Sequence, residues 1–242
     1  MLKRLKKLYI QEQFNPKILG LFINPFYFAR KGLYQSVSVL ILNLKGKLLD
    51  VGCGTKPYEG MCNVDKYIGL EIDDEVNRNH SFADVFYDGS TIPFKDKEFD
   101  SILSNQVFEH VFNPHVFLRE INRVTKMDGL FLITVPFVWD EHEQPYDYAR
   151  YSSFGLRHVL AENGFDIMEH RKSNNGVEVI FQLINDYIYK VTITKNNIIN
   201  LLITLFLMAP VNVTGLILSK ILPRNDDLYL DNIILARKTQ DV

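Results

Sequence analysis

The sequence predicts an α/β protein with a doubly wound, mostly parallel sheet of seven strands. Short apolar segments alternate with segments of helical periodicity, which is typical of a parallel sheet covered by helices on both faces. The first apolar segment runs directly into Gly52 and Gly54, as a buried strand does when it opens into a tight loop. The expected strands are 47–52, 67–72, 82–86, 99–104, 129–136, 165–170 and 228–237.

Helices are expected before the first strand and between the strands. Pro25 follows Asn24 at the start of one helix, where the missing N–H of proline costs nothing. Ser152 caps another helix and Gly164 ends it. The expected helices are 1–12, 25–42, 105–111, 114–126 and 152–163. In a sheet of this kind ligands bind at the carboxyl ends of the strands, so functional residues are expected there.

A hydrophobic helical insertion interrupts this alternation before the last strand. It contains the apolar run 198–218, whose longest stretch without strongly polar residues suits a buried helix and is shorter than a membrane span. Pro210 and Asn212 are expected to break this run further. Three arrangements stay open: packing on the domain or in a homodimer interface, docking on a membrane surface, and crossing a membrane. The chain thus divides into a basic helical segment 1–46, a core 47–172, the insertion 173–226, and the last strand with the tail 227–242.

Composition and charge predict a cytoplasmic globular protein with a basic N-terminus. Two cysteines without a signal-peptide pattern indicate a reducing compartment, and their spacing does not resemble a metal site. Residues 1–47 hold nine Lys/Arg and one acid, whereas the remainder holds 18 Lys/Arg and 28 acids. A basic amphipathic helix at 1–12 either packs on the core or contacts the inner face of a membrane peripherally. Because the basic run is short and the body is acidic, nucleic acid is not expected as a partner.

The loop after the first strand, Asp50-Val-Gly52-Cys53-Gly54, predicts a ligand site. A dinucleotide-binding loop needs a third glycine three residues later, and that position is Pro57. A P-loop needs Gly-Lys-Ser/Thr after its glycines, which this sequence lacks. The acid before the loop suits a cationic ligand better than a pyrophosphate. Cys53 is expected to be a small buried spacer and not a nucleophile.

Further motifs follow this loop in a regular order. Tyr67-Ile-Gly-Leu-Glu71-Ile-Asp73 is a strand that ends in an acid, and Asp88-Gly-Ser-Thr-Ile-Pro93 is a turn that begins with one. The other motifs are Phe99–Gln106, Glu109-His110-Val111, Glu120–Val124 and Asp128-Gly129. In order and spacing, residues 47–172 resemble the class I S-adenosylmethionine-dependent methyltransferase family of the small-molecule type. The resemblance implies a Rossmann-like methyltransferase fold and S-adenosyl-L-methionine as cofactor. The family often has a glycine where Lys56 stands.

Within this resemblance the polar residues take roles at the cofactor. Glu71 is expected to hold the ribose hydroxyls, and Asp88 the adenine amine, with Asp84 as the alternative for that role. An ordinary turn acid remains the other interpretation of Asp88. Asp50 either accepts a hydrogen bond from the ammonium of the methionine moiety or braces the glycine loop. Asn105, after the fourth strand, is expected to contact the cofactor or the acceptor.

The segment 136–151 after the fifth strand is expected to cap the acceptor. It holds the only Trp, a His flanked by acids, three Tyr and an Arg. His142 is the first candidate for general base, with Asp140 or Glu141 orienting its ring, because an unperturbed pKa of roughly 6.5 suits proton removal near neutrality. The alternative is that His142 only hydrogen-bonds within a rigid loop. Arg150 either clamps an anionic acceptor or pairs with Asp147. The expected substrate-binding residues are Trp139, Tyr146, Tyr148 and Arg150.

Glu109 and His110 form a second candidate pair after the fourth strand. Related methyltransferases that act on quinone precursors resemble this pair in placing an acid and a His there, sometimes for a metal. The sequence offers no further ligand beside them, so no metal is expected. His110 is expected to cap or pack, with a role as base as the alternative.

These observations predict a methyltransferase (EC 2.1.1.-) that acts on a small or lipid-linked acceptor. The polar and aromatic cap resembles relatives found with surface-polysaccharide biosynthesis, so a sugar hydroxyl is the first candidate acceptor. One alternative is a membrane-associated O- or C-methyltransferase of an isoprenoid or quinone precursor. The other is a non-catalytic module that binds S-adenosylmethionine.

Overall fold

The computed structural model describes residues 2–174 and 176–242 in two compact units. The helical unit comprises Met1–Ser36, Val138–Asp140 and Lys172–Asp231, and the sheet unit comprises Val37–Phe137, Glu141–Arg171 and Asn232–Val242. Met1 and the side chains of residues 2–5 and 7 lie outside the description, so the predicted faces of the basic helix lie outside it as well.

The sheet unit is built on seven strands, which confirms the predicted fold class. They are β1 (Lys47–Val51), β2 (Lys66–Ile72), β3 (Val85–Tyr87), β4 (Phe99–Asn105), β5 (Thr125–Pro136), β6 (Phe165–Lys172) and β7 (Asp231–Lys238). Their order in the sheet is β3-β2-β1-β4-β5-β7-β6. The pairs β1–β2, β1–β4, β2–β3 and β4–β5 are parallel. The strand order therefore reverses between β1 and β4, which is where such sheets bind ligands.

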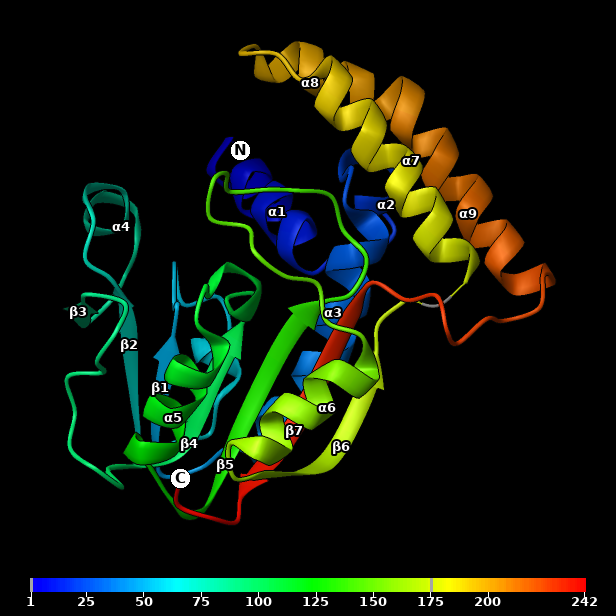
Figure 1. Ribbon diagram of the computed structural model, residues 1–242. Helices are drawn as coiled ribbons and strands as arrows, with labels where there is room; N and C mark the ends of the chain where they lie inside the picture. The colour runs from blue at the N-terminus through cyan, green and yellow to red at the C-terminus, as the bar shows by residue number, and fades with distance from the viewer. Residues whose placement is uncertain (1, 175) are drawn as a thin grey trace. The chain divides into compact units, whose positions relative to one another are not determined.

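Helices and short turns connect these strands. They are η1 (Ile41–Asn43), η2 (Glu59–Met61), α4 (Glu75–His80), η3 (Phe108–His110), α5 (Pro114–Val124) and α6 (Ser153–Glu162). Figure 1 shows α5 and α6 in front of the sheet. Ser152 caps α6 by accepting a hydrogen bond from the Gly155 N–H at 3.2 Å, as its side chain predicts.

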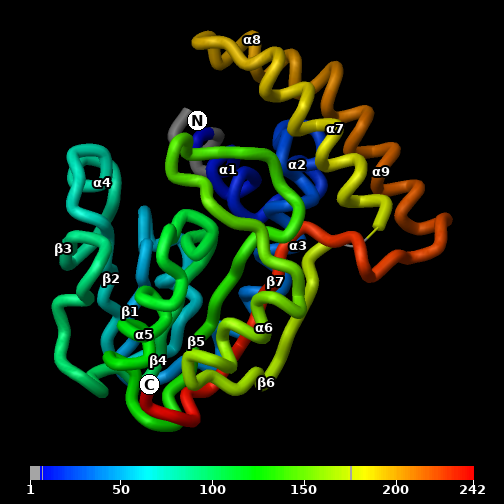
Figure 2. The backbone as a smooth tube through the Cα atoms, in the orientation of Figure 1, coloured from blue at the N-terminus to red at the C-terminus, as the bar shows by residue number. Residues whose placement is uncertain are grey.

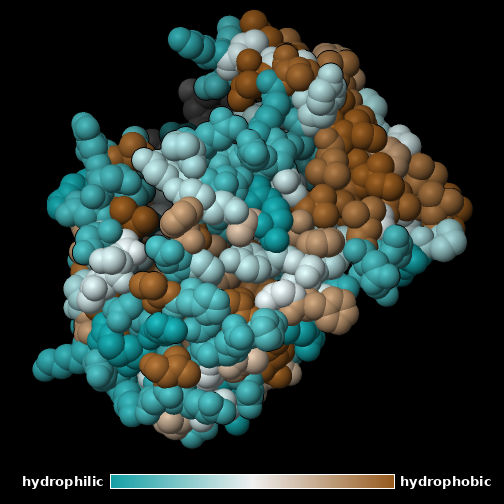
Figure 3. All heavy atoms as spheres, viewed as in Figure 1, coloured by the Kyte–Doolittle hydropathy of each residue, from teal (hydrophilic) through white to brown (hydrophobic). Residues whose placement is uncertain are grey.

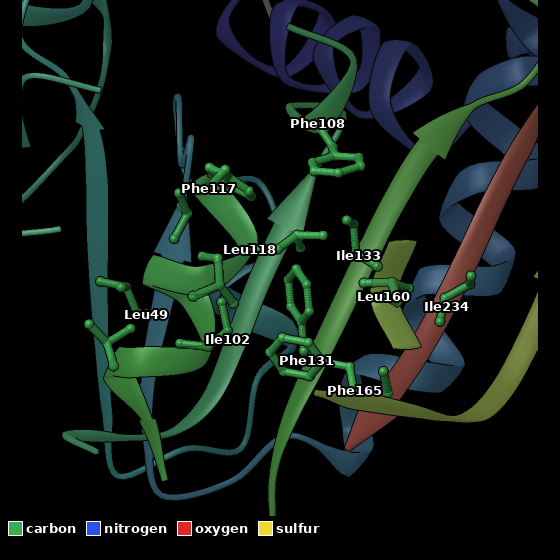
Figure 4. Close-up of a cluster of buried hydrophobic side chains, with 14 of the residues drawn as sticks. Leu49, Ile102, Phe108, Phe117, Leu118, Phe131, Ile133, Leu160, Phe165 and Ile234 are labelled. Atoms are coloured by element: carbon green, nitrogen blue, oxygen red, sulfur yellow. The ribbon is translucent and has the colours of Figure 1, made fainter. Parts of the chain in front are cut away.

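The core of the sheet unit lies where α5 and α6 pack on the central strands (Figure 4). Leu48, Leu49 and Val51 are all buried on β1, because a central parallel strand is covered on both faces. Phe131 and Phe165 are buried with ring centroids 5.3 Å apart. This packing fixes the carboxyl ends of β1, β2 and β4, from which the functional loops emerge.

The helical unit contains α1 (Leu2–Phe14), α2 (Gly20–Ile23), most of α3 (Tyr27–Leu40), and the insertion. The insertion forms α7 (Val177–Thr192), α8 (Asn197–Ile203), a π-helical turn η4 (Thr204–Met208) and α9 (Ala209–Ile221). Figure 2 shows α7 and α9 as neighbouring helices, consistent with their many contacts.

Two predictions about helices are wrong. The predicted helix 105–111 is only the short turn η3, because β4 extends to Asn105 and Gln106 then turns the chain with a φ of +56°. Pro210 and Asn212 do not break the apolar run, since one continuous helix covers Asn197–Ile221. The π-helical turn precedes Pro210, and there the Ala209 N–H donates to the carbonyl of Thr204, five residues back. This wider turn accommodates a proline that would clash in a regular α-helix.

Candidate functional site

A pocket lies at the carboxyl ends of β1, β2 and β4, where the sequence predicts the cofactor site. Its walls come from the loop after β1, the end of β2, the turn after β3, and the segment after β4. The lining residues are Gly52, Glu71, Ile72, Tyr87, Gly89, Ser90, Val107, His110, Val111, Phe112, Asn113, Val116 and Phe117. The wall therefore combines apolar side chains with a carboxylate and an imidazole, as small-molecule sites usually do.

The glycines of the loop after β1 are required by its geometry. Gly52 has a φ of +73°, and a Cβ there would lie 2.3 Å from Cγ2 of Val107. Gly54 has a φ of +48°, and a Cβ there would meet nothing within 4 Å. The first glycine lets the chain pass Val107, and the second leaves open space beside the backbone for a ligand.

Lys56, which stands where the family often has glycine, adopts a glycine-like backbone. Its φ is +51°, and its ammonium lies 2.6 Å from Oδ2 of Asp84. The same Asp84 oxygen accepts the Gly69 N–H at 2.7 Å. A Cβ at Gly69 would lie 2.4 Å from Cε of Lys56, so the lysine side chain fills the space above this glycine. Asp84, the alternative for the adenine amine, is thus engaged in bracing the glycine loop.

Glu71 ends β2 and forms part of the pocket wall, as the sequence predicts. Its Oε2 accepts the Gly54 N–H at 2.9 Å, and its Oε1 accepts the Ile72 N–H at 3.1 Å. Burial raises the pKa of Glu71, and these two N–H donors oppose the rise. The side chain is thereby fixed between the glycine loop and the pocket, where a carboxylate can accept ribose hydroxyls.

Asp50 is buried behind the glycine loop and accepts a hydrogen bond from the Tyr67 hydroxyl at 2.5 Å. Burial raises the pKa of Asp50 to about 7, and the Tyr67 hydrogen bond opposes this rise. The sequence did not single out Tyr67. The strand register offers the signal, because Asp50 pairs with Gly69 and Tyr67 lies two residues earlier on the same face. Cys53 is also buried, which raises the pKa of its thiol to about 12 and leaves it a spacer at neutral pH.

Asp88 and Asn105 flank the pocket. Asp88 accepts the N–H groups of Ser90 and Thr91 at 2.9 and 3.1 Å, and these bonds hold its pKa below the usual value. Its carboxylate therefore braces the turn that carries two pocket residues, in agreement with the interpretation as a turn acid. Asn105 accepts a hydrogen bond from the Thr134 hydroxyl at 2.9 Å, which fixes it at the end of β4.

A second cluster forms around His142 in the loop after β5. Its Nδ1 lies 3.2 Å from Oδ2 of Asp147, and its backbone N–H donates to the same oxygen at 2.9 Å. Arg150 donates two hydrogen bonds to Asp147, at 2.5 and 2.6 Å. These bonds hold the pKa of Asp147 near 2, with Arg150 as the main cause. The loop folds back and brings Asp147 to the ring, so Asp147 is a further candidate for orienting His142. The role of Asp140 or Glu141 in orienting His142 stays a prediction.

Glu109 and His110 join this cluster from the short turn η3. The rings of His110 and His142 meet edge to face with centroids 4.8 Å apart. The fully buried Glu109 places Oε1 3.8 Å from Nε2 of His110 and 4.0 Å from Nε2 of His142. Nδ1 of His110 also contacts the carbonyl of Tyr146 at 2.9 Å. Because His110 also lines the pocket, it connects this cluster with the predicted cofactor site.

The same three side chains are a set that could hold a metal ion. One ligand atom from each of Glu109, His110 and His142 lies within 4.8 Å of the others. The sequence indicated no third ligand, because His142 is separated from this pair by all of β5.

The remaining predicted residues divide between the two units. Asp140 belongs to the helical unit and forms an ion pair with Lys190. Trp139 contacts Phe26 in that unit, with ring centroids 6.1 Å apart. The others belong to the sheet unit: Glu141 accepts a hydrogen bond from Gln144, Tyr148 packs edge to face on Phe112, and Tyr146 is exposed.

Comparison with known proteins indicates the class of protein that has a site of this kind. Residues 49–133 match the methyltransferase domain family. An uncharacterised protein of Methanocaldococcus jannaschii is 33% identical over 94 residues, which cover 38% of this chain and 45% of that protein. The matches to three such curated relatives span between 38% and 54% of their length.

Solved structures share the fold over most of the chain. Phosphoethanolamine N-methyltransferase 2 of Haemonchus contortus, in complex with S-adenosyl-L-methionine, has a TM-score of 0.52 at 15% identity and covers 96% of this chain and 59% of that one. The [4+2]-cyclase SpnF has a TM-score of 0.57 at 18% identity and covers 95% and 94%. At these identities the likeness establishes the fold alone.

Residues 49–133 of the sheet unit therefore match a methyltransferase domain, which confirms the resemblance to the class I S-adenosylmethionine-dependent methyltransferases for this part of the chain. The cofactor of such a domain is S-adenosyl-L-methionine. The residues present fit it: open space lies beside Gly54, Glu71 is fixed in the pocket wall, and apolar side chains line the rest.

Proposed function

We propose that the chain transfers a methyl group from S-adenosylmethionine to a hydroxyl of a small or lipid-linked acceptor, with a sugar hydroxyl as the first candidate. The observation that carries this proposal is the pairing of His142 with Asp147 beside the pocket residue His110. When bound, the cofactor supplies an electrophilic methyl group on a sulfonium. The residues of the chain must then align the acceptor and remove its proton.

His142 is suited to remove that proton. Asp147 stays ionised at neutral pH because Arg150 holds its pKa near 2. Nδ1 of His142 lies 3.2 Å from Oδ2 of the ionised Asp147 and 3.4 Å from a guanidinium nitrogen of Arg150. In the tautomer that carries its proton on Nδ1, Nε2 is the basic nitrogen of the ring. The buried Glu109 lies 4.0 Å from Nε2 and stabilises the imidazolium that forms. A positioned base of this kind contributes roughly 10²–10⁴-fold to a rate.

Aromatic side chains of the same loop support a sugar as acceptor. Tyr146 and Tyr148 are both exposed, and Tyr148 lies against the pocket residue Phe112 at a centroid distance of 5.2 Å. Aromatic rings offer an apolar face and, in tyrosine, a hydroxyl for hydrogen bonds. Arg150 is engaged by Asp147, so its first role is to support the base.

Two other functions remain as alternatives. The same site suits methyl transfer to an isoprenoid or quinone precursor, whose hydroxyl also needs a base. A non-catalytic module that binds S-adenosylmethionine is the second alternative. Binding of S-adenosylhomocysteine without any methyl transfer would favour the non-catalytic module.

The test is a methyl-transfer screen against nucleotide sugars, lipid-linked sugars and quinone precursors, read by mass shift. With an accepted substrate, His142→Gln should lower kcat at least 100-fold and leave S-adenosylhomocysteine affinity within threefold. His158→Gln is the matched control. His158 is exposed on α6 and forms an ion pair with Glu162, one helical turn further along the same helix. Unchanged turnover of His142→Gln would remove it as the base.

A further inference from the structure

The insertion buries several polar side chains and exposes many apolar ones, unlike a typical helix of a water-soluble protein. Phe181, Val213 and Leu216 are apolar residues that also pack on the inside. The residues that α7 buries are Val179, Gln182, Asn185 and Asp186. Its exposed side chains include Ile180, Ile184, Tyr187 and Val191. The helix α9 repeats the pattern, burying Ala209, Asn212 and Gly215 while exposing Ile217 and Ile221. Soluble helices place their apolar stripe on the inside.

The polar side chains on the inside are joined by hydrogen bonds, and of the atoms in this network Oδ1 of Asn185 has no partner among the described residues. Gln182 accepts the N–H groups of Phe28 and Ala29, at 3.1 and 3.2 Å, and donates to a carbonyl of the same segment. Asn212 donates to two carbonyls near α2, each at 3.1 Å. Asn185 donates to Asn212 at 2.8 Å. Helices that lie in lipid bury polar groups against one another in this way.

Close packing between α7 and α9 follows the same pattern. A Cβ on Gly215 would lie 2.7 Å from the Cβ of Phe181, so the glycine allows the two helices to approach. Small residues at helix contacts are enriched in membranes, where close backbone approach replaces the hydrophobic driving force.

The outer side of these helices is one large apolar surface, which Figure 3 shows as a broad brown area. We name it the outer apolar surface; its exposed residues include Ile184, Tyr187, Leu201, Leu202, Phe206 and Ile217. Exposing such a continuous apolar surface to water costs free energy. It differs from the single scattered apolar residues that are common on the surfaces of soluble proteins.

Length and charge of this region match a lipid bilayer. The continuous helix Asn197–Ile221 has 25 residues, or about 37 Å, against a hydrocarbon thickness of roughly 30 Å. Among the described residues it is the one helix long and apolar enough to cross a membrane. The sequence contains no acid from residue 187 to 225, and its four cations, Lys190, Lys195, Lys220 and Arg224, lie near the helix ends. Basic residues at such ends meet anionic lipid headgroups.

We propose that the outer apolar surface of α7–α9 is embedded in a lipid bilayer containing anionic lipids. A second copy of this chain would also cover apolar side chains, but it would not account for cations near the helix ends of a segment, 187–225, that contains no acid. This inference is independent of methyl transfer. If the proposed methyl transfer also holds, the bilayer proposal narrows the class of acceptor to one carried by a lipid; this conclusion on the acceptor rests on the proposed function.

The test uses the full chain synthesised in a cell-free system with preformed vesicles of phosphatidylcholine, with or without 30% phosphatidylglycerol, followed by flotation. The wild type should float with the vesicles, and threefold more should float with the anionic ones. The variant Leu201→Gln/Phe206→Ser/Ile217→Gln should lower the floated fraction at least tenfold. The matched control Val76→Gln/Phe154→Ser/Met168→Gln changes three exposed apolar residues of the sheet unit and should float like the wild type.

Affinity for S-adenosylhomocysteine checks that the sheet unit of each variant is folded, since this unit holds the pocket, and helical content from circular dichroism checks the helical unit. Failure of the folded wild type to float overturns the proposal. Flotation that the Leu201/Phe206/Ile217 variant retains overturns it as well. A wild type that stays in the aqueous fraction as a dimer, and becomes monomeric in this variant, assigns the surface to a second copy instead. Loss of methyl transfer with flotation intact would contradict only the proposed function.

Discussion

Replacing Asp50 by Asn distinguishes its two predicted roles. In the free protein burial raises the pKa of Asp50 to about 7, so its carboxylate is the minor form below pH 7 and the main form above it. If the carboxylate accepts the ammonium of the cofactor, binding must remove this proton whenever the pH is below 7. Affinity should therefore rise with pH up to about 7 and then level off. If Asp50 only braces the glycine loop through Tyr67, binding should not depend on its proton.

The size of the effect follows from the pKa. At pH 5, two units below about 7, removing the proton costs about 2.7 kcal/mol, which is about 100-fold in affinity. Wild-type affinity for S-adenosylhomocysteine should thus be about 100-fold weaker at pH 5 than at pH 9. Asp50→Asn has no proton to lose at this site, so its affinity should lack this dependence. Asparagine keeps an acceptor for the Tyr67 hydroxyl, which preserves the loop.

Calorimetric titration of the full chain at five pH values from 5 to 9 measures this dependence. The ratio of wild-type to variant affinity is the quantity to follow, because titration of the ligand itself cancels in it. A ratio that rises toward pH 7 assigns Asp50 to the ammonium. A ratio that stays constant from pH 5 to 9 refutes that role and leaves Asp50 as a brace of the loop.

Two further predictions concern the loops around the site. Lys56→Ala should lower the free energy of unfolding by about 1 kcal/mol more than Lys56→Gly. Both variants lose the Asp84 ion pair, but only glycine adopts a φ of +51° at little cost. Equal melting temperatures of the two variants would contradict this prediction. Asp147→Asn should lower the melting temperature at pH 7, because a lowered carboxyl pKa contributes stability above its ordinary value of 3.8. That contribution is lost as the pH falls from 3.8 toward 2, so the difference in melting temperature between variant and wild type should shrink over this range. A difference in melting temperature that persists at pH 2 would show that Asp147 does not act through its charge.

The cofactor side of the site could be predicted because its signals are local. Gly52, Gly54 and Glu71 each sit at a strand end, and the strands themselves are marked by continuous apolar runs. Once the order of the strands is known, their ends must meet at one edge of the sheet. Lys56 could be recognised as a departure, but its left-handed backbone depends on the contact with Gly69 and Asp84 across two strands.

The acceptor side was harder to predict because it lies in a long loop without periodicity. Four acids lie within five residues of His142, and the prediction from the sequence chose Asp140 and Glu141. The structure pairs the ring with Asp147, since the loop folds back through the Arg150 fork. The contact of His142 with Glu109 spans 33 residues of sequence and depends on the packing of β4 against β5. Local sequence carries no signal for such a contact.

The insertion shows a limit of periodicity itself. A helix with one apolar and one polar face gives the same sequence pattern whether water or lipid surrounds the protein. The pattern shows that two faces exist, and it does not show which face packs against the rest of the protein. In α7 the deciding facts are the partners: Gln182 binds the backbone of Phe28 and Ala29 on the inside, while Ile184 is exposed. The face of α7 that packs therefore carries the polar Gln182 beside the apolar Phe181. The proposal of a bilayer at the outer apolar surface therefore rests on the hydrogen bonds within the helical unit and not on its apolar content.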